Sequence, residues 1–390
     1  MNNIFDDKCN RKNTRSTKWL PVEANDDVLP VWIADMEFKL HPKVRMVLSE
    51  RLDHGIFGYT EVNKESLNDL RNWYSERYRY EFNTDELLIT TGVVQSLSAS
   101  IRILSDELDK IIVLGPHYHP FVDKIQQNNR IAVVSHHILK NGRYVIDYDD
   151  LNSKIDDKCK VFIFCNPHNP TGTLYTEEEV KELASFCQKH SLKIISDEIH
   201  ADFVYEDKVI YPIINCNDYT INNSISLLSP GKTFNAAGFK IGVALIKNQE
   251  LRDKFDKEAI KVGIKSVNTF GYLLFENCYK YGSEWVNELL DYINGNRMYC
   301  YDYISKNMPQ IMTCKSDATY LIWLDLSCLK YRSLELKEKL ISEAKILPSM
   351  GYEFGDDYDQ YIRVNIALCK QDLVEVMKRL HQFIEDNSWK

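Results

Sequence analysis

The sequence lacks the features that mark several large classes of protein. It has no CxxC pair, no apolar run approaching the roughly 18 residues of a membrane span, and no apolar stretch in its polar N-terminus. Fifteen glycines and eleven prolines in 390 residues exclude collagen-like and low-complexity chains. We therefore expect a protein of the cytoplasm, with neither a secretory signal nor a membrane segment.

Charge and cysteine usage narrow the classes further. The 48 Lys and Arg against 57 Asp and Glu give a net charge of −9, which argues against a broad surface for nucleic acid or anionic membrane. The ten cysteines are scattered, and a chain with 44% hydrophobic residues can bury a core without disulfides. We expect reduced thiols in a reducing compartment.

The middle of the chain alternates short apolar runs with helical patterns. The runs do not alternate with polar residues, as is typical of strands buried on both faces, and they cover residues 111–114, 161–165, 193–196, 225–228 and 243–246. Between them lie an apolar stripe over 94–104 and a capping box formed by Thr176 and Glu179. This order predicts an α/β protein with a mainly parallel sheet and helices on both faces.

The last hundred residues have a different pattern. Helical periodicity over 285–303 and 334–344 is interleaved with apolar strands at 320–324 and 361–366, and an amphipathic helix follows at 372–383. These segments predict a smaller α+β unit.

Polar motifs follow the predicted strands, and ligands of parallel sheets bind at the carboxyl ends of strands. Asn169 lies in a loop stiffened by two Asn-Pro steps, and its amide could donate to a ligand oxygen. Asp197 ends the next strand, with His200 three residues on, and could hold a ligand cation. An ordinary strand-to-helix turn and a helix N-cap are the structural alternatives for these two motifs.

Two further segments suit an anion or a covalent cofactor. Gly92, Val93 and Val94 begin a helix, where free amides attract anions, although an ordinary turn explains them equally well. Lys232 follows the strand at 225–228 among apolar neighbours, and loss of hydration there favours the neutral amine that Schiff-base chemistry needs. Arg363 alternates with apolar residues and could bind a carboxylate, or could form a surface salt bridge.

Other site types find little support in the sequence. The Gly-Lys-Thr at 231–233 lacks the earlier glycine of a P-loop, because residue 226 is Ser. The pairs His117/His119 and His136/His137 have no carboxylate or cysteine partner at a usual zinc spacing, so we expect no metal. No GxSxG or GxGxxG motif occurs.

As a set, these loops resemble the fold-type I pyridoxal-phosphate enzymes of the class I/II aminotransferase superfamily. The resemblance covers nearly the whole chain. Finer motifs are similar to the branch of cystathionine β-lyases and cysteine–sulfur (C–S) lyases, which includes the bacterial modulator of the maltose regulon; they lie at 29–38 (LPVWIADMEF), 54–59 (HGIFGY), 165–172 (CNPHNPTG), 197–200 (DEIH) and 320–325 (YLIWLD). Ordinary aminotransferases usually carry Tyr where His200 stands.

The resemblance implies an aspartate aminotransferase-like fold with two domains. The large cofactor-binding domain would span residues 46–285, and the small domain would combine residues 1–45 with 286–390. It also implies a homodimer, in which Tyr59 reaches the cofactor phosphate of the neighbouring subunit.

The resemblance further assigns roles at the site. Lys232 would hold pyridoxal phosphate and take the substrate's Cα proton, and Asp197 would pair with the pyridine nitrogen. Tyr118 would stack on the ring, and could protonate the departing sulfur. The other expected cofactor contacts are Gly92, Val93, Val94, Asn169, His200, Ser229 and Lys240; the expected substrate contacts are Arg363, Asp35 and Asn169. Many family members carry Arg at the position of Lys240, and a Lys lacks that bidentate fork.

The expected reaction is α,β-elimination of L-cystathionine or a related S-substituted L-cysteine to pyruvate, ammonia and a thiol. Transamination of neutral or aromatic amino acids is the enzymatic alternative, because it begins with the same Cα deprotonation. A regulatory, protein-binding role without turnover is the alternative from another class. The sequence does not rank the sulfur amino acids against one another.

Overall fold

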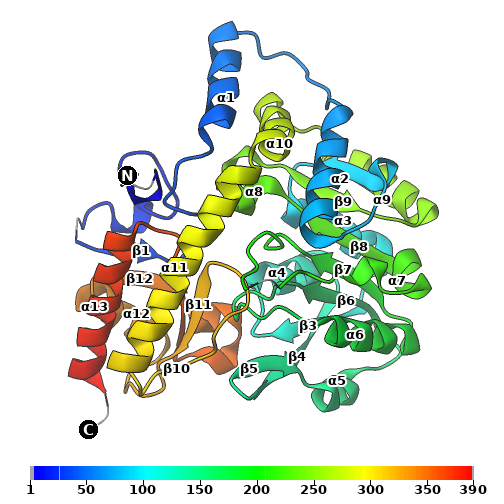
Figure 1. Ribbon diagram of the computed structural model, residues 1–390. Helices are drawn as coiled ribbons and strands as arrows, with labels where there is room; N and C mark the ends of the chain where they lie inside the picture. Colours follow the sequence, from blue (N-terminus) through cyan, green and yellow to red (C-terminus); the bar gives the residue numbers. More distant parts are fainter. Residues whose placement is uncertain (1–3, 26, 207, 389–390) are drawn as a thin grey trace.

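The computed structural model describes residues 4–25, 27–206 and 208–388, and its larger sheet has eight strands (Figure 1). Their spatial order is β2 (Leu87–Thr90), β9 (Gly242–Leu245), β8 (Ser224–Leu228), β7 (Lys193–Asp197), β6 (Cys159–Cys165), β3 (Lys110–Gly115), β4 (Ile131–Lys140) and β5 (Arg143–Ile146). Neighbours from β8 to β4 run parallel, whereas β9 is antiparallel to both its neighbours and β5 is antiparallel at the edge. The predicted mainly parallel sheet is confirmed.

Burial on both faces explains why the apolar runs became central strands. Every residue of β8 is buried, and in β6 only Lys160 is exposed. Helices cover the two faces, as the sequence predicted. They are α2 (Glu65–Tyr78), α3 (Val93–Leu104), α4 (His119–Gln127), α5 (Tyr148–Lys154), α6 (Glu177–Lys189), α7 (Asp218–Asn223), α8 (Pro230–Thr233), α9 (Gln249–Lys261) and α10 (Thr269–Tyr281).

Local sequence signals fix individual helix ends. Thr176 caps α6 by accepting the Glu179 N–H at 3.2 Å, and the Glu179 carboxylate accepts the Thr176 N–H at 2.8 Å. This reciprocal pair confirms the predicted capping box and satisfies two amides that the first turn leaves free.

A second, five-stranded sheet combines the two ends of the chain. Its order is β1 (Leu29–Val31), β12 (Ile346–Met350), β13 (Tyr361–Asn365), β11 (Leu321–Asp325) and β10 (Met312–Thr313). The helices outside the larger sheet's segment are α1 (Pro42–His54), α11 (Ser283–Asn307), α12 (Ser333–Ser342) and α13 (Lys370–Asn387). Figure 1 shows α11 running from the neighbourhood of α10 down to the smaller sheet. The two sheets thus come from separate parts of the chain, while the exact domain limits stay a prediction.

The topology gathers the predicted motifs at one edge of the larger sheet. Because β6, β7 and β8 are parallel neighbours, their carboxyl ends bring Asn169, Asp197 and Lys232 to the same side. Among the described residues, no helix is both long and apolar enough to cross a membrane.

Candidate active site

A cavity of about 380 Å³ lies where the carboxyl ends of these strands meet the smaller sheet. Most of the predicted site residues line it: Val93, Val94, Tyr118, Asn169, Asp197, His200, Lys232 and Arg363. The structure therefore brings together groups from six separate segments of the chain, as a single site requires.

Lys232 reaches the cavity from the short helix α8. Ser229 caps this helix by accepting the Gly231 N–H at 3.0 Å, and its hydroxyl donates to the Ile241 carbonyl at 2.8 Å. The Lys232 amine donates to the Ala34 carbonyl. Burial, with a smaller contribution from the positive charge of Arg363, lowers the pKa of Lys232 to about 8. Lowering the pKa from its ordinary value of 10.5 raises the fraction of neutral amine, which is the form that acts as nucleophile and base.

Asp197 ends β7 as a buried carboxylate. It accepts the Ile199 N–H at 3.1 Å, and no lysine, arginine or histidine of the described chain forms an ion pair with it. Burial raises the pKa of Asp197 to about 6. A ligand with a protonated ring nitrogen would supply the missing counter-charge.

Arg363 is held on the opposite side of the cavity by the smaller sheet. Its Nη1 donates to Oδ1 of Asn169 at 2.8 Å, and its Nη2 donates to the Ser349 hydroxyl at 3.0 Å and to the Trp32 carbonyl at 3.1 Å. The guanidinium carbon lies 4.7 Å from the centre of the Phe354 ring. Burial lowers the pKa of Arg363 to about 10, so it stays cationic at neutral pH.

The start of α3 lines another side of the cavity. Gly92 precedes the helix with a φ of +142°, a backbone conformation that residues with a side chain rarely adopt. The backbone of β9 packs closely against Gly92, since a Cβ on Gly242 would lie 2.8 Å from the Gly92 carbonyl carbon. The first-turn amides of a helix have no carbonyl partner within the helix, so Val93 and Val94 present a site suited to an anion.

Other predicted residues do not line the cavity of this single chain. Gly92 and Ser229 precede α3 and α8 and are not in the lining, Lys240 is exposed, and Tyr59 is fully exposed beside a separate hollow. The Asp35 carboxylate instead forms ion pairs with Arg11 at 2.9 Å and Lys18 at 3.6 Å. The cofactor and substrate contacts predicted for these residues stay predictions.

The structure adds cavity residues that sequence reasoning missed. They come from the N-terminal segment, from β12 and from the turn after β12, and include Thr17, Trp32, Ile33, Ser349, Glu353 and Phe354. One signal was available, since Gly351 and Gly355 bracket Glu353 in a turn. No periodicity links the remaining residues to the site, because only tertiary packing brings them there.

Buried polar atoms show that this cavity suits pyridoxal phosphate. His200 Nδ1 and Arg363 Nε are buried without hydrogen-bond partners in the described chain. Together with the unpaired Asp197, the amine of Lys232 and the amides at the start of α3, they offer partners for a ring nitrogen, a carbonyl carbon and a phosphate. No group of three or more metal-ligating side chains gathers among the described residues.

Comparison with known proteins shows which sequences this chain resembles. The family model "Aminotransferase class I and II" matches residues 25–380. The protein named cystathionine β-lyase PatB of Bacillus subtilis is 31% identical, over 96% of this chain and 98% of its own length.

Solved structures agree with this match. A PLP-bound putative aminotransferase from Clostridium difficile 630 superimposes with a TM-score of 0.94 at 33% identity, covering 98% of this chain and all of that one. A PLP-bound C–S lyase from Staphylococcus hominis superimposes with a TM-score of 0.91 at 27% identity, covering 98% of both chains. The aspartate aminotransferase-like fold expected from the sequence is confirmed.

Proposed function

The chain belongs to the aminotransferase class I and II family, and we propose that it is a pyridoxal-phosphate-dependent carbon–sulfur β-lyase. Its substrates are L-cystathionine or related S-substituted L-cysteines, and its products are pyruvate, ammonia and a thiol. The observation that carries the proposal is the partly buried Lys232, whose amine shares one cavity with Asp197 and Arg363. The similarity to a cystathionine β-lyase favours elimination over amino transfer.

Besides Lys232, several groups lining the cavity would hold the cofactor. The amides of Val93 and Val94 would bind its phosphate, the Asp197 carboxylate would keep its ring nitrogen protonated, and Tyr118 would cover the ring face. Asn169 Oδ1 already accepts a hydrogen bond from Arg363, which leaves the amide N–H groups of Asn169 for the ring oxygen. Pyridoxal phosphate bound in this way supplies an electron-poor ring that accepts the electron pair of the substrate's broken Cα–H bond.

The chain's own residues then orient the substrate and move its protons. Arg363, fixed by its bonds to Asn169 and Ser349, would grip the α-carboxylate. The neutral Lys232 amine would take the Cα proton. The Cβ–S bond then breaks with its electron pair leaving on sulfur, and Tyr118 would give that sulfur a proton. Water taken up by the remaining three-carbon unit releases pyruvate and ammonia.

Two further groups in the cavity would recognise the far end of the substrate. Glu353 and His119 line the same cavity, and neither is needed for the cofactor contacts. Burial lowers the pKa of His119, so the His119 ring is neutral at pH 7. The negative charge of this pair comes from the Glu353 carboxylate. This charge favours substrates such as cystathionine, which carry a second ammonium group beyond the sulfur.

A homodimer would complete the site. The segment after α1 exposes Ile56, Phe57 and Tyr59, with Tyr59 wholly accessible, and Figure 1 shows α1 and this segment at the outer edge of the molecule. An exposed apolar segment of this kind suits burial against a second copy of the chain. Tyr59 would then reach the phosphate of the cofactor bound to that second copy. Ten unpaired cysteines support a location in the cytoplasm.

Product analysis tests the proposed reaction. The purified enzyme with pyridoxal phosphate and L-cystathionine should release pyruvate and a free thiol in equal amounts. Release of neither product from cystathionine, cystine or S-alkyl cysteines would contradict it.

A further inference from the structure

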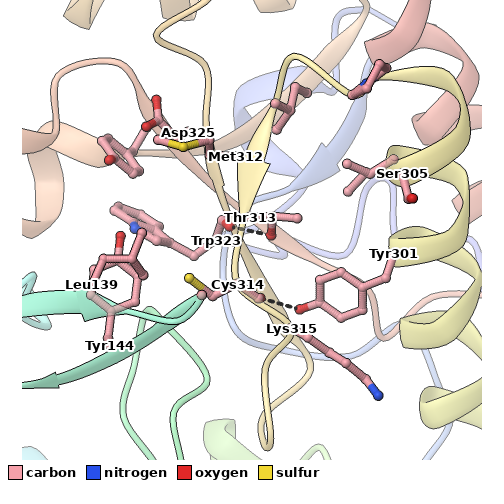
Figure 2. Close-up of a pocket in the computed structure, with 15 residues that line it drawn as sticks. Leu139, Tyr144, Tyr301, Ser305, Met312, Thr313, Cys314, Lys315, Trp323 and Asp325 are labelled. Atoms are coloured by element: carbon pink, nitrogen blue, oxygen red, sulfur yellow. Dashed lines mark hydrogen bonds between the residues drawn. The ribbon is translucent and has the colours of Figure 1, made fainter.

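A second cavity, of about 630 Å³, lies away from the proposed catalytic site (Figure 2). It opens between the β4–β5 hairpin, the C-terminal part of α11 and the strands β10, β11 and β13. Figure 2 shows Leu139 and Tyr144 on the hairpin side, Tyr301 and Ser305 on the helix, and Trp323 between them. The cavity thus sits at the seam between the two sheets.

Its walls are largely aromatic and apolar. Trp323 stacks on Tyr361 with ring centres 5.1 Å apart and planes inclined by 19°. The Tyr301 hydroxyl is already engaged with the Cys314 carbonyl at 3.1 Å and the Ser316 hydroxyl at 3.0 Å. Such walls suit a ligand with an aromatic or apolar body.

Two polar groups in this lining are only partly satisfied among the described residues. Asp325 is only 6% exposed, accepts the Ser327 N–H at 2.8 Å and is hydrogen-bonded to the Tyr361 side chain, yet no cationic side chain in the described ranges pairs with it. The cationic Lys315 of the same lining is paired with Glu206 at 2.8 Å. The buried Nε1 of Trp323 also has no hydrogen-bond partner in the described chain. A buried carboxylate without a counter-charge and a buried N–H without an acceptor both carry an energetic cost.

This cavity is distinct from the catalytic one. The two share no lining residue in the described chain. They are separated by the edge-to-face contact of Trp323 with Phe354, whose ring centres lie 5.3 Å apart, and Phe354 in turn lies against Arg363. A ligand can therefore be assigned to one cavity or the other by mutation.

We propose that this cavity binds a small organic cation with an aromatic body. Its protonated amine pairs with Asp325, its ring packs on Trp323 and Tyr144, and a hydrogen-bond acceptor on the ligand receives the Trp323 N–H. This charge complementarity selects a cation over neutral or anionic analogues of the same shape.

The test measures binding to the holoenzyme by calorimetry, without turnover. The probe is N,N-dimethyl-2-phenoxyethanamine, a tertiary amine that cannot condense with a carbonyl group. It is compared with neutral 2-phenoxyethanol and anionic phenoxyacetate. We expect the cation to bind most tightly, and Asp325→Asn to weaken it by about tenfold or more, the worth of a hydrogen bond to a charged group. Asp302→Asn, on the exposed face of α11, makes the same charge change and should leave binding unaltered.

Two further variants keep the outcome decisive. Met312→Trp, at the exposed rim of the cavity, should weaken binding by filling the space without touching Asp325. Glu353→Gln, in the catalytic cavity, should preserve binding of the probe. The proposal is overturned if the wild-type protein does not bind the cation, if 2-phenoxyethanol binds equally well, or if Glu353→Gln abolishes binding while Asp325→Asn does not.

Discussion

Arg363 on the smaller sheet donates to Oδ1 of Asn169, in the loop after β6, over 2.8 Å. This single bond joins the group that would hold the substrate carboxylate to the group that would contact the cofactor. It also fixes the orientation of the Asn169 amide, because the oxygen faces Arg363 and the N–H groups face away.

The bond predicts that the two residues act together. Arg363→Lys keeps the positive charge but loses the two-pronged hydrogen bonding of the guanidinium. KM for cystathionine should therefore rise roughly thirtyfold, which corresponds to the lower end of the free-energy cost of breaking a buried charged contact. Asn169→Ala should also raise KM, because Arg363 loses one of its anchors. In a double-mutant cycle of kcat/KM, we expect a coupling of about 0.5–3 kcal/mol. Strictly additive effects would show that the bond does not matter for catalysis.

Asp197→Asn should affect cofactor affinity and apoenzyme stability in opposite directions. Without a carboxylate the ring nitrogen loses its counter-charge, so pyridoxal phosphate should bind more weakly. The folded-state pKa of about 6 lies above the ordinary value of 3.8, so the wild-type apoenzyme loses stability as pH rises between these values, by up to about 3 kcal/mol. Urea unfolding should therefore find the apo variant more stable than wild type at pH 8, and should find no such gain near pH 4. An equal effect at both pH values would exclude the buried charge as its cause.

Glu353→Gln should change substrate preference and leave the chemistry intact. We expect KM for cystathionine to rise by about tenfold, because the distal ammonium loses its partner. KM for S-methyl-L-cysteine, which lacks that ammonium, should change little. Steady-state kinetics with both substrates measure the ratio, and a parallel loss for both would mean that Glu353 supports the fold of the turn instead.

The sequence predicted the centre of the larger sheet better than its edges. The runs in β6 and β8 are buried on both faces, and such strands read as continuous apolar stretches. The sequence pattern does not predict β4 and β5, because polar and charged residues interrupt their apolar runs. It also does not predict β1 and β12, each of which contains a proline. Proline weakens the sequence signal of a strand, yet β1 and β12 pair with each other in the smaller sheet.

The candidate site shows the same division. Lys232, Asp197 and Asn169 each follow a strong strand, so their convergence could be predicted from the topology alone. Trp32, Ser349 and Glu353 reach the cavity through the pairing of β1 with β12 and the turn after it, a contact more than 300 residues apart in the chain. No local pattern encodes that contact. The ion pairs of Asp35 with Arg11 and Lys18 span a shorter stretch of chain, but it has no periodic pattern that would predict them.

Lys232→Ala should remove both the visible absorption of the bound cofactor and turnover. We expect kcat to fall by about 10³-fold or more, because the variant loses its covalent anchor and its base together. Lys257→Ala, an exposed lysine on α9, is the matched control and should behave as wild type. Retained activity in Lys232→Ala would mean that another group performs the proton transfer.

The partition between elimination and amino transfer tests the central claim most directly. The holoenzyme is given L-cystathionine together with a keto acid, and pyruvate, free thiol and newly formed amino acid are measured in one reaction. A C–S lyase should produce pyruvate and thiol in equal amounts, at a rate independent of the keto acid. Amino transfer that depends on the keto acid, without pyruvate or thiol, would contradict the account.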